Sequence, residues 1–115
     1  MNINDIFSAL RLAKSHNYNF VIKTSIAVGK GINGTDYTDF IACGIREREG
    51  SEERIISISV LESSLMIDHS KTGAYGYHQV TFLPFDKVAC INVIMSSKIP
   101  FQSKGTPAVE FVGVD

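Results

Sequence analysis

The stretch INDIFSALRLAKSHNYNFVIKTSIAV, residues 3–28, decides the fold class, because the period of its apolar residues changes part-way along. Up to Ala13 the apolar residues recur every three or four positions, which is the spacing of one face of an α-helix. From Tyr18 they alternate with polar residues, which is the spacing of a half-buried β-strand. The sequence therefore predicts a helix over about residues 3–15, followed directly by a strand.

The rest of the chain keeps the alternating pattern and divides it with turn residues. Apolar residues mark further strands at Ile41, Cys43 and Ile45, at Ile56, Ile58 and Val60, at Val80 and Phe82, from Val88 to Met95, and at Val109, Phe111 and Val114. Short strands joined by turns favour antiparallel pairing, because parallel strands need long crossover connections. We expect an α+β, β-rich fold: the N-terminal helix packs on an antiparallel sheet of about five to seven strands, or on a small, partly closed β-barrel. The strands run from about residue 18 to residue 114.

Two segments leave alternatives open. Glu62–His69 reads either as a continued strand or as one helical turn, since periodicity alone does not settle a short apolar run. Pro84 has no N–H to donate to a sheet, so the strand around Phe82 is either an edge strand or broken there.

Size and composition indicate one globular domain, residues 1–115. The chain is 44% hydrophobic and 20% charged, which are ordinary globular values. Its 11 basic and 12 acidic residues give a net charge of −1, which argues against a general nucleic-acid binder. No signal-peptide pattern and no apolar run of about 20 residues is present. We therefore expect a cytoplasmic protein without a membrane segment.

The two cysteines, Cys43 and Cys90, each lie in an apolar stretch. Free cysteine packs as a small hydrophobic residue, so we expect two reduced thiols in the core. A disulfide between strands is the alternative.

Residues 29–34, GKGING, match the spacing of a dinucleotide-binding glycine motif. That motif needs a helix directly after it, so that the helix N-terminus meets the pyrophosphate. The residues that follow, TDYTDFI, are β-prone instead. We interpret the stretch as a hairpin turn closed by Asn33-Gly34.

The sequence predicts no catalytic residue, no metal site and no cofactor. His69 and His78 lack metal-ligand spacing with each other or with the cysteines. Asp68-His69-Ser70 has the residue types of a nucleophilic triad, but neighbours on a strand point to opposite faces. An enzyme remains an alternative only if His69, His78 and Asp68 converge in the fold.

The candidate partner-binding residues lie in loops. Tyr75, Tyr77 and His78 fall in or next to a Tyr- and Gly-rich loop, a composition typical of recognition surfaces. Lys30 in the glycine-rich turn and Phe101 in the C-terminal loop are the other two. We therefore predict a non-enzymatic protein–protein interaction module, of the adaptor, immunity or inhibitor type, that acts through exposed loops and sheet edges.

The run Thr81–Val93 resembles a late strand of Sm-like small β-barrels. The resemblance implies a small barrel that binds RNA or nucleotides, which is an alternative function. The candidate contact residues for this function are Lys30, Tyr75, Tyr77 and Arg46 or Arg48, chosen for their basic or aromatic side chains, and the resemblance itself supplies no contact residue. Under each hypothesis, homo-oligomers are expected through an edge strand or through residues 108–114.

Overall fold

The computed structural model describes residues 1–30, 34–46, 51–72, 77–99 and 109–115. In chain order its elements are α1 (Ile3–His16), β1 (Tyr18–Thr24), β2 (Gly29–Lys30), β3 (Asp36–Tyr37), β4 (Asp39–Ile41), β5 (Cys43–Arg46), β6 (Ser51–Val60), β7 (Ser64–Thr72), β8 (Tyr77–Pro84), η1 (Phe85–Lys87, a 3-10 helix), β9 (Val88–Lys98) and β10 (Glu110–Val112). The predicted class, an N-terminal helix with a β-rich remainder, is confirmed.

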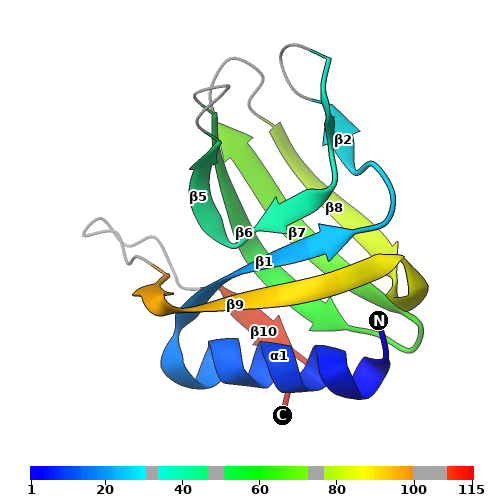
Figure 1. Cartoon of the computed structure of the whole chain (residues 1–115), viewed down its shortest axis with the longest axis vertical. Helices are drawn as coiled ribbons and strands as arrows, with labels where there is room; N and C mark the ends of the chain where they lie inside the picture. Colours follow the sequence, from blue (N-terminus) through cyan, green and yellow to red (C-terminus); the bar gives the residue numbers. More distant parts are fainter. Residues whose placement is uncertain (31–33, 47–50, 73–76, 100–108) are drawn as a thin grey trace.

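α1 begins and ends where the sequence supplies caps. Asn2 Oδ1 accepts a hydrogen bond from the backbone N–H of Asn4 at 2.7 Å, which satisfies one of the free donors of the first turn. Asn17 ends the helix in the left-handed conformation, with φ of 55°, and its N–H returns to the last carbonyls. The buried face between the caps consists of Ile6, Leu10 and Ala13. In Figure 1 the helix lies along one end of the sheets, and it contacts β1 and β9.

The strands form two main sheets. β1 is the centre of a three-stranded antiparallel sheet in the order β4-β1-β9. The five-stranded sheet has the order β10-β6-β7-β8, and β5 pairs with the first part of β6. β10 runs parallel to β6, which departs from the antiparallel expectation. About fifty residues separate these two strands, and that is enough chain to return in the same direction.

The two sheets are joined at one side and open at the other. At the joined side, Ala42 donates its N–H to the carbonyl of Phe20 at 3.0 Å and accepts from the N–H of Ile55 at 2.8 Å. Ala42 therefore links β1 to β6. At the open side, β8 and β9 each have one strand partner among the described residues, and η1 connects them. The described sheets do not close into a barrel (Figure 1).

The core lies between the two sheets and α1. Its largest fully buried apolar side chains are Phe20, Phe40, Ile6, Leu10, Ile22, Ile55, Ile58, Leu65, Ile67 and Leu83. The ring of Phe20 on β1 lies 5.9 Å from that of Phe111 on β10, so the two sheets meet directly there. In the described part of the chain, no helix is long and apolar enough to cross a membrane.

The structure decides the segments that the sequence left open. Ser64–Thr72 is a strand, so the helical alternative for Glu62–His69 is wrong. Pro84 ends β8, an edge strand among the described residues, as one alternative predicted. The predicted hairpin pairing is confirmed, because β2 pairs with β3 and Lys30 lies opposite Asp36. Residues 31–33, which include Asn33 of the predicted turn, lie outside the described residues.

Candidate interaction surface

The first part of the candidate site is the edge of β8 that faces away from β7. This edge has no strand partner among the described residues, and we call it the free edge. β8 pairs with β7 in a register that places Pro84 opposite Ser64. The N–H of Phe85 donates to the carbonyl of Ser63 at 3.2 Å, which fixes the phase of the ladder. Because hydrogen-bonded and non-bonded pairs alternate in an antiparallel ladder, every second residue of β8 bonds towards β7. The backbone groups of His78, Val80 and Phe82 therefore face the free edge.

Pro84 lies two residues after Phe82, so its backbone nitrogen also faces the free edge. That nitrogen carries no hydrogen to donate. Proline is tolerated in a sheet at such positions, because it removes no ladder hydrogen bond there. The free edge thus offers three N–H donors, from His78 to Phe82, and ends at a residue that donates nothing. This is the backbone pattern that an added strand requires.

The side chains of the free-edge residues lie on the outer face of the sheet, away from the core. Phe82 is 62% exposed and Val80 is 47% exposed. Across the sheet, Met66 lies opposite Phe82, Ser59 opposite Met66 and Val112 opposite Ser59, so these side chains share one face. Val112 is 46% exposed and Met66 is half-buried. We call Val80, Phe82, Met66 and Val112 the outer strip.

The outer strip is not predicted from the sequence. Alternation at Val80 and Phe82 is typical of a strand that buries its apolar side, but here that side faces outwards. The opposite side of β8 carries Gln79 and Thr81, both half-buried, and the fully buried Leu83. An exposed phenylalanine beside other apolar side chains marks a contact surface more strongly than single exposed aliphatic residues do.

Among the predicted partner-binding residues that the structure describes, Tyr77 and His78 lie on β8 and Lys30 lies on the β2–β3 hairpin. His78 lies on β8 next to the outer strip, exposed, with Nε2 bonded to Asp68 Oδ1 of β7. Lys30 lies on the β2–β3 hairpin and forms a 2.8 Å ion pair with Asp36. Tyr77 is the first residue of β8, opposite Lys71. Tyr75 and Phe101 lie outside the described residues.

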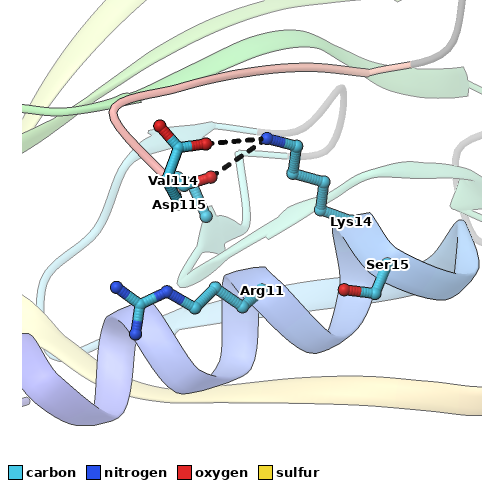
Figure 2. Close-up of a pocket in the computed structure, with 5 residues that line it drawn as sticks. All are labelled: Arg11, Lys14, Ser15, Val114 and Asp115. Carbon is cyan, nitrogen blue, oxygen red and sulfur yellow. Dashed lines mark hydrogen bonds and ion pairs between the residues drawn. The ribbon is translucent and has the colours of Figure 1, made fainter.

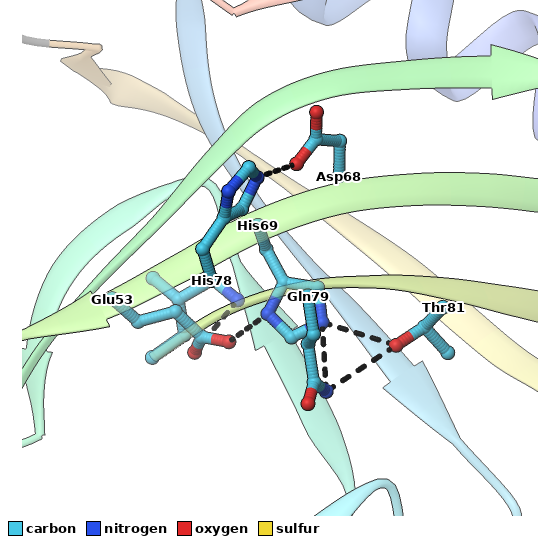
Figure 3. Close-up of polar contacts among 7 residues, drawn as sticks. Glu53, Asp68, His69, His78, Gln79 and Thr81 are labelled. Carbon is cyan, nitrogen blue, oxygen red and sulfur yellow. Dashed lines mark hydrogen bonds and ion pairs between the residues drawn. The ribbon is translucent and has the colours of Figure 1, made fainter. Parts of the chain in front are cut away.

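A buried polar cluster fills the inner face beneath β8. His69 on β7 and Glu53 on β6 are each 1% exposed, and His69 Nδ1 lies 3.9 Å from Glu53 Oε1 (Figure 3). His69 Nε2 lies 3.0 Å from Thr81 Oγ1 and accepts from the side-chain amide of Gln79 at 3.2 Å. With Nε2 accepting, the ring proton is on Nδ1, the side of Glu53. Glu53 Oε2 also accepts from the backbone N–H of Ile41 at 3.3 Å.

This geometry separates the residues of the enzyme hypothesis. Asp68 bonds to His78 on the outer face, whereas His69 points into the core, as strand alternation predicted for neighbours. The cluster does have the acid–imidazole–hydroxyl order of a nucleophilic triad, in Glu53, His69 and Thr81. The acid and the imidazole are closed off from solvent, however, and a reactant must reach the groups that act on it. We therefore interpret the cluster as a structural network that connects β6, β7 and β8 through polar contacts.

An open depression in the described part of the chain lies away from these residues. It lies between α1 and the segment after β10 and is lined by Arg11, Lys14, Ser15, Val114 and Asp115 (Figure 2). Lys14 Nζ donates to the carbonyl of Val114 at 3.0 Å and pairs with Asp115 Oδ1 at 3.3 Å. Neither His69 nor His78 lines this depression. Its lysine is already engaged in fastening the C-terminal segment to the helix.

The cysteines differ from the expected pair of core thiols. Both are free, but Cys90 is exposed on β9 and only Cys43 is half-buried. Burial raises the pKa of the Cys43 thiol, and Glu52 raises it further, against a smaller lowering by Arg54. The expectation that Cys90 lies in the core is wrong, because its side chain shares the strand face of Lys23, directly opposite on β1.

We therefore expect the two thiols to react with Ellman's reagent in two phases. Cys90 should react first and Cys43 roughly tenfold more slowly, because the reactive species is the exposed thiolate. A Cys90→Ser variant should keep only the slow phase. If both thiols of the native protein reacted in a single fast phase, the burial of Cys43 would be contradicted.

Comparison with protein-family models, with curated proteins and with solved structures finds no match.

Proposed function

We propose that the chain is a non-enzymatic protein–protein interaction module, of the adaptor, immunity or inhibitor type, which binds an extended strand along the free edge of β8. The observation that carries the proposal is Phe82, which combines a 62% exposed aromatic ring with a backbone on the free edge. Strand addition gives affinity through main-chain hydrogen bonds and specificity through alternate side chains. The free edge of β8 supplies the main-chain hydrogen bonds, and the outer strip supplies the side-chain contacts.

In this mode the partner strand accepts from the N–H groups of His78, Val80 and Phe82 and donates to their carbonyls. Every second side chain of the partner then packs against the outer strip. An apolar, extended segment fits this surface, because the two β8 side chains at its centre are Val80 and Phe82. Pro84 sets one limit of the pairing, since it has no donor to offer.

The alternatives from the sequence have less support. The nucleotide-binding hypothesis uses Lys30, Tyr75, Tyr77 and Arg46 or Arg48, and the structure describes the side chain of Lys30 alone among them. That side chain is paired with Asp36. The enzyme hypothesis needs His69, His78 and Asp68 together, and they lie on two faces of the sheet. We place the module in the cytoplasm, where free Cys43 and Cys90 stay reduced.

Replacing Phe82 with serine is expected to weaken partner binding by about tenfold or more, since buried aromatic anchors dominate such interfaces. The matched control is Met95→Ser, because Met95 is 60% exposed and lies on β9 of the other sheet. Both variants and the native chain would serve as tagged baits in extracts of the native host, with captured proteins quantified by mass spectrometry. Dissociation constants with the purified partner would follow.

The thermal midpoints of both variants should stay close to that of the native chain, because both side chains are exposed. Equal capture by all three baits would show that β8 is not the binding surface. Loss with Met95→Ser alone would place binding on β9 instead.

A further inference from the structure

We propose that the strand which β8 takes is β8 of a second copy, paired antiparallel about a two-fold axis at Val80. The inference rests on the proposed function, since it names the partner of the same surface. Its starting point is the symmetry of the free edge. Among the described residues of β8, the N–H groups that face outwards are those of His78, Val80 and Phe82, so Val80 is the midpoint of these donors.

An axis at Val80 satisfies every donor on this edge. Val80 of one copy exchanges two hydrogen bonds with Val80 of the other, and His78 exchanges two with Phe82 of the other copy at each end. Six main-chain hydrogen bonds form in total, and no N–H on the described edge, Tyr77–Pro84, is left over. Pro84 lies just beyond the paired residues, where the absence of an N–H costs nothing. An axis nearer to Pro84 brings Pro84 into the pairing, and an axis nearer to Tyr77 moves Phe82 opposite residues that lie outside the described part of the chain.

The side chains are complementary in the same register. On the outer face Val80 meets Val80, and Phe82 meets His78, so apolar and aromatic groups lie together at the centre. On the inner face Gln79 lies opposite Thr81 of the other copy, and these two residues are able to donate and accept.

Charge does not oppose the pairing. The acidic residue closest to the axis on the outer face is Asp68, which lies opposite Val80 on β7. The two copies of Asp68 are therefore three strand spacings apart, about 14 Å. The net charge of −1 per chain adds little repulsion between copies. Because the paired edge is short, we expect a concentration-dependent dimer rather than an obligate one.

The register is tested by a single cysteine at the axis. In a Cys90→Ser background, which removes the exposed native thiol, Val80→Cys places two thiols on residues whose Cα atoms are about 5.5 Å apart, within the range of a disulfide. The matched control is Met95→Cys, because Met95 is 60% exposed, more than Val80, and lies on β9 of the other sheet, outside the proposed interface. The proposed pairing does not bring the two control thiols together.

Mild oxidation is expected to link most of the Val80→Cys protein as a dimer and at least tenfold less of the Met95→Cys protein. Sedimentation of the native chain over a range of concentrations should show a monomer–dimer equilibrium. Equal linking of the two variants would overturn the register. A native chain that stays monomeric at all concentrations would overturn the second copy as partner. If the chain is monomeric but captures a different protein, and Phe82→Ser abolishes that capture, the proposed function holds and only the second copy as partner is wrong. If Phe82→Ser does not change the capture, both the proposed function and the dimer are wrong.

Discussion

Replacing Phe20 with alanine is expected to lower the free energy of unfolding by about 3–5 kcal/mol, the usual cost of removing a fully buried phenylalanine. Phe20 is 0% exposed and lies on β1, the central strand of the three-stranded sheet. Its ring reaches that of Phe111 in the other sheet. The substitution therefore opens a cavity between the two sheets at a point where they contact each other.

The measurement is urea unfolding followed by circular dichroism, with the slope compared between variants. Phe82→Ala is the control, because it removes the same atoms from an exposed position on β8. We expect it to change the free energy of unfolding by less than about 1 kcal/mol. Comparable losses in the two variants would contradict the assignment of Phe20 to the core and Phe82 to the surface.

The sequence predicted the elements whose signals are local. α1 has its apolar period and both caps within residues 2–17, so its bounds were predictable to within a residue. The hairpin at Gly34 follows from adjacent turn residues as well, and that glycine has a positive φ of 81°. Pro84 allowed an edge strand to be predicted, because a missing N–H restricts where a strand can sit.

The site itself depends on contacts between distant strands, which the sequence does not display. Alternation shows that the two faces of β8 differ, but not which of them is buried. Here the inner face carries Gln79 and Thr81, because His69 and Glu53 provide polar partners inside. The more apolar pair, Val80 and Phe82, is left outside. A buried polar cluster thus reversed the usual rule that the apolar face points to the core.

Replacing Glu53 with alanine is expected to lower the free energy of unfolding by about 3 kcal/mol, since it removes a buried acid from its partners. The carboxylate lies 3.9 Å from His69 Nδ1 and accepts from the N–H of Ile41 at 3.3 Å. Alanine leaves that N–H and the imidazole without this acceptor in the core. Glu53→Gln retains a side-chain oxygen for Ile41, so we expect a smaller loss.

The control is Glu52→Ala, because Glu52 is the preceding residue on β6 and is exposed. Its effect on urea unfolding should stay within about 0.5 kcal/mol. Equal effects of Glu52→Ala and Glu53→Ala would show that the cluster contributes nothing to stability. If the predicted order holds, the cluster stabilises the arrangement of β6, β7 and β8 in which Gln79 and Thr81 face inwards. That arrangement in turn presents Phe82 on the free edge, so a destabilised cluster should also weaken binding at β8.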